Sequence, residues 1–157
     1  MRVLAIDPGY ERLGIAVLEK QRGKDVLIHS ECFQTPKEHA HSKRLSAILI
    51  RLEEIIREYK PNTCAIETLF FAKNQTTALK VAEVRGIVLA LCDKCGMEIF
   101  EFSPAAIKIG VTGYGKSDKT AVTKMIPLLI KIDRKIKHDD EFDAIAVGIT
   151  CLNSRPN

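Results

Sequence analysis

Short apolar runs dominate the first third of the chain and predict β-strands. Residues 2–7 form an apolar run that ends at a proline–glycine turn, and residues 13–18 and 25–33 continue with β-type residues on either side of a polar turn. Connections this short favour an antiparallel meander of three strands. Two further short strands are predicted over residues 63–67 and 97–102.

Apolar residues recur every three or four positions before the fourth predicted strand and again between the fourth and the fifth. This spacing predicts helices. Residues 45–59 have the pattern of an amphipathic helix. Residues 76–92 predict a second helix that is apolar around most of its circumference, and such a helix must be covered on both sides. We expect one side to face the sheet. The other side faces either a second subunit or the interior of the same chain, and the pattern leaves these alternatives open.

The last third of the chain predicts three more helices. A short helix is expected over residues 103–108, followed by a mobile glycine-rich loop at 110–115. Ser117 is expected to cap the next helix, in which Pro127 should cause a kink or break. The final helix is predicted over residues 139–152. Together these elements predict an α/β fold with a five-stranded mixed sheet flanked by helices.

Length and composition indicate one ordinary globular domain that comprises residues 1–157. Hydrophobic residues make up 46% of the chain and charged residues 28%. No apolar run approaches the roughly 20 residues needed to cross a bilayer, and an acid at position 7 interrupts the stretch that a signal peptide would continue. We therefore expect a cytoplasmic protein without membrane association. The net charge of +4 is compatible with a polyanionic partner but does not establish one.

Four acidic residues occupy positions that folding alone does not explain. Asp7 ends the first predicted strand, and Glu67 ends the fourth. If these strands are adjacent and parallel, their carboxyl ends place the two side chains together, where ligand sites of α/β sheets collect. Asp140 and Asp143 share one face near the start of the last helix because they are three residues apart. Each acid also has a structural alternative, as a turn residue, an ion-pair partner or a helix cap.

Carboxylates this close need protons or cations to coexist. Two like charges 4 Å apart repel by about 4 kcal/mol at an effective dielectric constant near 20. Mg²⁺ relieves this repulsion with oxygen ligands, and Mn²⁺ can substitute for it. Two such ions, roughly 3.5–4 Å apart, would activate a water molecule and stabilise the leaving 3′ oxygen of a phosphodiester. This pattern predicts hydrolysis of a nucleic acid that leaves 5′ phosphates.

Spacing alone leaves the ligands of the last helix undecided. Asp139 with Asp143, four residues apart, is about as suitable as Asp140 with Asp143. His138 is also close enough to assist a metal site.

Several short segments of the chain occur together and in order. They are Ile6-Asp7-Pro8-Gly9, Ala65-Ile66-Glu67, Phe70-Phe71-Ala72-Lys73-Asn74, Arg85-Gly86 and Asp140-x-x-Asp143-Ala144-x-Ala146. The glutamate followed by Phe-Phe-Ala-Lys-Asn is the most specific of them. With these segments the chain resembles the RuvC family of Holliday-junction resolvases over essentially its whole length.

This resemblance implies a ribonuclease H-like fold, a homodimer, and paired symmetric nicks in four-way junction DNA during recombination and repair. It assigns catalysis and metal binding to Asp7, Glu67, Asp140 and Asp143, and so favours Asp140 over Asp139. It also implies cooperation with the RuvA–RuvB branch-migration complex and a modest sequence preference at the cut.

Aromatic and basic residues around these acids are the candidates for DNA contacts. They are Phe70, Phe71, Lys73, Lys108, Lys116 and Lys119. Phe70, more than Phe71, is expected to stack on unpaired bases at the junction centre, and the lysines to hold phosphates. By resemblance, Lys108 and Lys119 match basic positions near the active site. Lys80 and Arg85 would extend this basic track, and the role of the basic cluster at residues 131–137 stays open.

Three other functions compete with junction cleavage. A nuclease of the same fold that processes ribosomal RNA precursors would have similar acids, but the Phe-Phe-Ala-Lys-Asn segment argues against it. A catalytically silent protein that binds branched DNA would not need all four acids. An actin-like phosphotransferase would need a second lobe, for which 157 residues leave no room.

Overall fold

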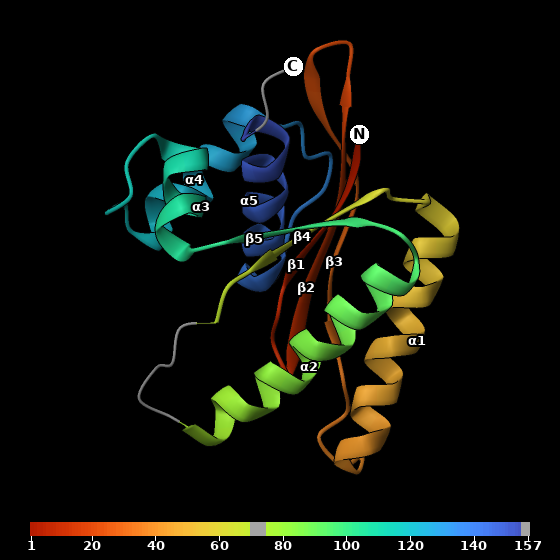
Figure 1. Ribbon diagram of the computed structural model, residues 1–157. Helices are drawn as coiled ribbons and strands as arrows, with labels where there is room; N and C mark the ends of the chain where they lie inside the picture. Colours follow the sequence, from red (N-terminus) through yellow and green to blue (C-terminus); the bar gives the residue numbers. More distant parts are fainter. Residues whose placement is uncertain (70–74, 155–157) are drawn as a thin grey trace.

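The computed structural model describes residues 1–69 and 75–154. In this part of the chain, five strands form one sheet, and five helices flank it (Figure 1). The strands are β1 (Arg2–Asp7), β2 (Arg12–Gln21), β3 (Lys24–Gln34), β4 (Thr63–Glu67) and β5 (Glu98–Phe102). The helices are α1 (His41–Tyr59), α2 (Gln75–Lys94), α3 (Pro104–Thr112), α4 (Lys119–Leu129) and α5 (Asp139–Asn153). The predicted five-stranded mixed sheet flanked by helices is confirmed.

The order of the strands is β3-β2-β1-β4-β5. Strands β1, β2 and β3 form an antiparallel meander because the connections between them are short. Strands β4 and β5 run parallel to β1 and are each reached through a helix. The register pairs Ile6 with Ile66. Asp7 and Glu67, the next residues, therefore end neighbouring strands at the same edge of the sheet.

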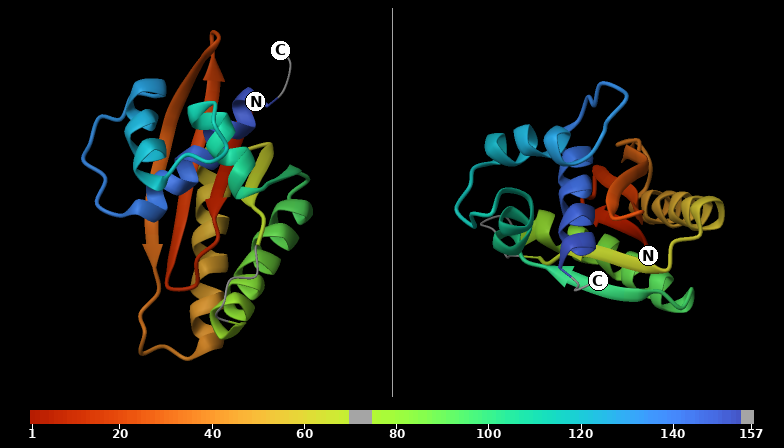
Figure 2. Two further views of the ribbon diagram at one scale, coloured as in Figure 1. Left: turned by 90° about the vertical axis from the view of Figure 1, so that its left-hand side faces the viewer. Right: turned by 90° about the horizontal axis from the view of Figure 1, so that it is seen from above.

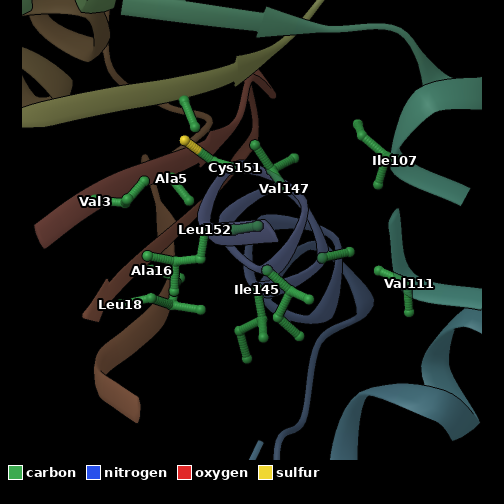
Figure 3. Packing of buried hydrophobic residues seen from close by; sticks show 14 of the residues in the cluster. Val3, Ala5, Ala16, Leu18, Ile107, Val111, Ile145, Val147, Cys151 and Leu152 are labelled. Carbon is green, nitrogen blue, oxygen red and sulfur yellow. The ribbon is translucent and has the colours of Figure 1, made fainter. Parts of the chain in front are cut away.

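Helix α5 packs on one face of the sheet (Figure 3). Because side chains alternate along a strand, Val3 and Ala5 of β1 and Ala16 and Leu18 of β2 point to this face, where they meet α5 residues such as Ile145. Helices α3 and α4 cover the outer side of α5, as Figure 2 shows. With sheet and helices around it, α5 is buried along most of its length, which fixes the position of its first turn.

Helices α1 and α2 cover the opposite face of the sheet (Figure 1). The alternate residues of β1, Leu4 and Ile6, pack there against Ile48 and Leu52 of α1 and Val88 of α2. All five side chains are at most 1% exposed. The periodicity that predicted an amphipathic helix over residues 45–59 therefore identified a true core face, although the helix begins earlier, at His41.

The outer face of α2 is not covered by any described part of the chain. Leu79 is 66% exposed, and Ala82, Gly86 and Ala90 lie exposed along the same side of the helix. The alternative of a central helix covered on both sides by its own chain is therefore wrong for the described residues. Despite this apolar composition, no described helix is both long enough and apolar enough to cross a membrane.

Helix α3 is longer than predicted. Ser103 caps it as expected, since its Oγ accepts a hydrogen bond from the Ala106 N–H at 3.2 Å. The helix continues to Thr112, so the predicted loop at 110–115 begins only at Gly113. Gly110 serves helix packing, because a Cβ atom there would lie 2.5 Å from Oγ1 of Thr150 in α5. Sequence alone could not distinguish this use of glycine from a loop.

Helix α4 also begins differently from the prediction. Asp118 caps it, with its Oδ1 accepting a hydrogen bond from the Ala121 N–H at 2.7 Å. Ser117, the predicted cap, instead forms a hydrogen bond with Thr112 at 2.7 Å between the two hydroxyl oxygens. Pro127 does not break the helix, which continues to Leu129. The proline lies in the last turn, so its missing N–H costs only one helical hydrogen bond near the helix end.

Candidate active site

The carboxyl ends of β1 and β4 bring Asp7 and Glu67 to the same edge of the sheet. Asp7 follows a run of four completely buried residues, and Glu67 is the last residue of β4. Arg85 of α2 holds this end of β4, because its guanidinium donates a hydrogen bond to the Glu67 carbonyl oxygen at 2.6 Å and pairs with Glu101. The Arg85 side chain is only 12% exposed. It positions Glu67 rather than extending a surface for DNA.

The first turn of α5 reaches this edge because residue 14 is a glycine. Gly14 is paired with Asp7 in the β1–β2 register. A Cβ atom on Gly14 would lie 2.0 Å from the carbonyl oxygen of Asp140 and 3.1 Å from Cβ of Asp7. Glycine inside a strand often marks such a close approach of another backbone. A glycine within a predicted strand was visible in the sequence. The residue that approaches it, Asp140, lies 126 positions further along the chain, and the sequence did not identify it.

The carboxylates of this cluster act on one another electrostatically. Burial raises the pKa of Asp7 to about 8, with the charges of Asp143, Glu67 and Asp140 adding to the effect. Burial also raises the pKa of Glu67 and of Asp143. The structure thus brings together all four acids that the sequence singled out.

Two basic side chains lie among these acids. Nζ of Lys119 is 2.7 Å from Oδ2 of Asp139 and 2.7 Å from Oδ2 of Asp143. Nε of Arg12 is 3.2 Å from Oδ2 of Asp140. The positive charge of Lys119 lowers the pKa of Asp7, Glu67 and Asp143 against the stronger effect of burial. The sequence analysis identified Lys119 but missed Arg12, which pairs with an acid at the far end of the chain.

Asp139 and His138 have different surroundings from Asp140. The Asp139 side chain is 52% exposed and the Asp140 side chain 18% exposed. The ion pair with Lys119 lowers the pKa of Asp139 to about 2. The His138 ring forms a hydrogen bond at 3.0 Å with the amide of Gln34 in β3. Of the two acids that spacing left open, Asp140 is thus the less exposed, and its charge acts on Asp7.

The donor set fits a hard divalent cation, although the ligands are not gathered into a preformed shell. Among residues 1–69 and 75–154, no three acidic, histidine or cysteine side chains stand close enough to form a metal site by themselves. Instead, Lys119 forms an ion pair with Asp143, and Arg12 forms one with Asp140. Carboxylate oxygens are the ligands that Mg²⁺ and Mn²⁺ prefer. Burial and, after it, the neighbouring acids raise the pKa of Asp7, and such a cation would offset both effects.

A small cavity of about 170 Å³ opens beside Glu67 and Asp143. Lys108 and Lys119 line it together with these two acids, and the charge of Lys108 lowers the pKa of Glu67 against the effect of burial. Lys116 lies exposed in the α3–α4 connection and does not line this cavity. Three other predicted contacts, Phe70, Phe71 and Lys73, lie outside the described residues.

A polar network that the sequence analysis did not detect fixes the loop after Asp7. The Tyr10 hydroxyl is hydrogen-bonded to Nδ1 of His41 at 2.8 Å, and Nε2 of His41 lies 2.8 Å from a Glu83 carboxylate oxygen. The Arg44 guanidinium lies 4.0 Å from the centre of the Tyr10 ring. This network connects the turn after β1 with the start of α1 and with α2, so the position of α2 is coupled to the acid edge.

Together, the sheet order and the carboxylate cluster define a ribonuclease H-like nuclease. The family model described as "Crossover junction endodeoxyribonuclease RuvC" matches residues 3–151. The chain therefore belongs to the RuvC family, whose members are hydrolases of the crossover junction endodeoxyribonuclease type.

Individual relatives agree over nearly the full length. The crossover junction endodeoxyribonuclease RuvC of Thermosipho melanesiensis is 42% identical over 148 residues, which cover 94% of each chain. The protein of the same name from Petrotoga mobilis is 40% identical over 155 residues, which cover 99% of this chain and 95% of the relative. Among solved structures, T. thermophilus RuvC in complex with a Holliday junction substrate superposes with a TM-score of 0.88 at 28% identity, with 96% of this chain and 92% of that chain covered. The predicted family and fold are confirmed.

Proposed function

We propose that this protein resolves four-way DNA junctions by hydrolysing one phosphodiester in each of two opposed strands, leaving 5′ phosphates. The observation that carries the proposal is the cluster of four mutually interacting carboxylates at one sheet edge in a chain that matches the RuvC family model over residues 3–151. A related structure of 28% identity is described as bound to a Holliday junction substrate, which supports the choice of substrate.

The RuvC family comprises metal-dependent nucleases, and we infer that Asp7, Glu67, Asp140 and Asp143 would hold two Mg²⁺ ions, with Mn²⁺ able to replace them. Bound ions of this kind stabilise negative charge on a phosphate under attack and lower the pKa of water. The burial of Asp7 supports this assignment. Burial destabilises the charged carboxylate and raises its pKa to about 8, and a bound cation would stabilise that charge.

The other residues of the site position and balance these acids. Arg85 holds the end of β4 and thereby the backbone of Glu67. Lys119 compensates the charge of Asp143 and can turn to a phosphate when cations bind the acids. Lys108 lines the same cavity as Glu67 and Asp143, and its charge acts on Glu67. These two lysines are the DNA contacts that the site supports best.

A homodimer suits both the substrate and α2. A four-way junction must be cut twice at symmetric positions, and two-fold symmetry of the enzyme supplies two identical sites. The exposed face of α2, with Leu79, Ala82, Gly86 and Ala90, is the surface that we assign to this dimer. Its small residues allow two helices to approach closely. Phe70, Phe71, Lys73 and Lys116 would then contact the junction, and RuvA–RuvB would be the partner that supplies migrated junctions.

The proposal is tested with purified protein, a synthetic mobile four-way junction and Mg²⁺, beside an Asp7→Asn variant. We expect paired symmetric nicks with 5′ phosphates in the wild type, and a loss of at least about 1,000-fold in rate in the variant. A linear duplex of the same sequence is the matched substrate control and should remain intact. Tight junction binding without cutting in either Mg²⁺ or Mn²⁺ would indicate a silent binding protein. Cutting of single-stranded RNA with the junction left intact would indicate an RNA-processing enzyme.

A further inference from the structure

A groove with a volume of about 620 Å³ runs between the edge strand β3 and the connection from α4 to α5. We call it the β3 groove and define it by residues 27–32 on the strand side and 131–138 on the loop side. The loop side contains Lys131, Arg134, Lys135 and Lys137, the basic cluster whose role the sequence left open. Figure 2 shows this connection passing beside the sheet before it enters α5.

The loop side of the groove is anchored to the sheet. The Arg134 guanidinium donates hydrogen bonds to the Ser30 carbonyl oxygen and, at 3.1 Å, to the Ser30 hydroxyl, and it pairs with Glu141. The Glu141 side chain is only 5% exposed. At the other end, His138 is hydrogen-bonded to Gln34. The lysines between these two anchors are therefore presented from a fixed backbone.

The charges that line the groove leave a positive excess. Each acid on its walls has a basic partner: Glu31 pairs with Arg51 at 2.7 Å, Asp133 with Lys131 at 2.8 Å, and Glu141 with Arg134. Lys135 and Lys137 have no ion pair with any acid among the described residues. Two cations on one wall of an open groove, without acidic partners, favour a polyanionic ligand.

The β3 groove reaches the acid cluster. Its end at His138 adjoins the first residues of α5, including Asp140. Gln34, which contacts His138, is paired in the β2–β3 register with Arg12, and Arg12 in turn contacts Asp140. The cavity with Lys108 and Lys119 lies beside Glu67 and Asp143, on the side of α3 and α4. The acid cluster therefore has lysine side chains on each of two sides.

We propose that the β3 groove binds phosphates of the DNA that continues from the cut site on the side of β3, with Lys135 and Lys137 as the phosphate contacts. This inference rests on the proposed function. An endonuclease cuts within a strand, so the strand continues in both directions from the bond that is cleaved. Lys108 and Lys119 provide for one direction, and the β3 groove provides for the other. Phosphate contacts of this kind fix the position of DNA and depend strongly on salt.

A peptide added to the edge of the sheet is the competing occupant, and two observations disfavour it. Strand addition needs free backbone groups along the edge, but Arg134 occupies the carbonyl oxygen of Ser30. Lysines beside an edge strand also oppose pairing with another strand. The groove therefore suits a phosphate backbone better than a β-strand.

The test compares two double variants in full-length protein. Lys135→Gln with Lys137→Gln removes the two proposed contacts. Lys60→Gln with Lys94→Gln removes the same charge from the ends of α1 and α2, which cover the other face of the sheet. Binding of a fluorescent four-way junction is measured by anisotropy in EDTA, which prevents cutting, between 50 and 200 mM salt. We expect the groove variant to bind about 10-fold more weakly at 100 mM salt. Its plot of log affinity against log salt should be shallower by about 1–2.

Each outcome of this experiment has a defined meaning. The control variant should match the wild type, and Lys135→Arg with Lys137→Arg should retain affinity because the charge is kept. A groove variant that binds and responds to salt like the control would overturn the inference, while wild-type junction cleavage would leave the proposed function intact. Failure of the wild type itself to bind or cut the junction would overturn both.

A labelled ten-residue glutamate peptide is the second probe. Loss of its binding in the groove variant, with junction affinity unchanged, would assign the groove to an acidic peptide and overturn the inference. Equal thermal unfolding midpoints would show that the variants are folded.

Discussion

The carbonyl oxygen of Asp140 lies so close to Gly14 that a Cβ atom on residue 14 would be 2.0 Å from it. Two segments at opposite ends of the sequence thus meet without a side chain between them, directly beside Asp7. This contact sets the distance between the first turn of α5 and the central strands. The geometry of the carboxylate cluster therefore depends on a residue that has no functional group.

Replacing Gly14 with alanine should displace the start of α5 and reduce cleavage. A methyl group has no room beside the Asp140 carbonyl, so the helix must shift, and a shift of about 1 Å at a reacting centre costs roughly 100-fold in rate. Overpacking should lower the free energy of unfolding by about 1–3 kcal/mol. Single-turnover cleavage and urea unfolding measure these effects. Gly148→Ala is the control, because its Cβ would meet only the flexible Leu18 side chain, about two turns along α5 from Asp140. It should lower the free energy of unfolding without a comparable loss of cleavage. A fully active Gly14→Ala protein would contradict this account of the site.

The raised pKa of Asp7 predicts a pH dependence of stability in the absence of metal. Because the folded-state pKa is about 8 and the ordinary value is 3.8, the folded protein holds a proton that the unfolded chain releases between these values. The contribution of Asp7 to stability therefore falls as pH rises from about 4 to about 8. Asp7→Asn removes this penalty, and should be more stable than the wild type by about 1–3 kcal/mol at pH 9. Urea unfolding from pH 5 to 9 in EDTA provides the measurement, and a difference that does not grow with pH would refute the assignment.

Metal binding should offset that difference in stability. Mg²⁺ at about 100 times its dissociation constant would stabilise a folded protein by about 2.7 kcal/mol. Asp7→Asn lacks one of the proposed ligands and should gain much less. Thermal unfolding with and without Mg²⁺ compares the two proteins. Equal shifts in both would show that the cation binds elsewhere.

Lys119 should set the acidic limb of the pH–rate profile. Its charge lowers the pKa of Asp7, Glu67 and Asp143, so replacing it with glutamine raises all three. The acids then ionise at higher pH, and the acidic limb of cleavage should move to higher pH by about one unit. Lys124→Gln serves as the control because Lys124 is exposed on the same helix and lies outside the cavity beside Glu67. If both variants kept the wild-type profile, Lys119 would have no electrostatic role in the reaction.

The exposed face of α2 should control the oligomeric state. Gly86→Arg introduces a long charged side chain at a position that no other described part of the chain approaches within 4 Å. The monomer should fold, while the dimer dissociation constant should rise at least about 100-fold, since a buried unpaired charge at an interface costs several kcal/mol. Sedimentation equilibrium measures the dimer, and a supercoiled junction substrate distinguishes single from paired nicks. Ile50→Arg on α1, at another exposed apolar residue, should leave the dimer intact. A dimer that tolerates Gly86→Arg would exclude this face as the interface.

Local patterns in the sequence predicted the sheet and most helices because periodicity reports directly which side of an element is buried. The bounds predicted for β4, residues 63–67, agree with the structure, since a short apolar run between a proline and an acid has few other solutions. The positions of Asp7 and Glu67 at strand ends were predictable for the same reason. The motifs around them, through their family resemblance, assigned Asp140 and Asp143 to the same cluster, and the structure brings both close to Asp7. The start of α4 was predicted one residue early, at Ser117, because serine and aspartate cap helices about equally well and local sequence does not decide between them.

Only the tertiary structure decided which distant parts of the chain are in contact. Arg12 beside Asp140, Gln34 beside His138 and Arg134 on Ser30 connect the β-meander to the last helix. Each pair is more than 100 residues apart in sequence, and no local pattern specifies which partner a charged or polar side chain will meet. The sequence determines which residues are acidic, basic or apolar and which element carries them. Packing of α5 across the meander then determines which charges face one another, and hence where the carboxylate cluster and the β3 groove lie.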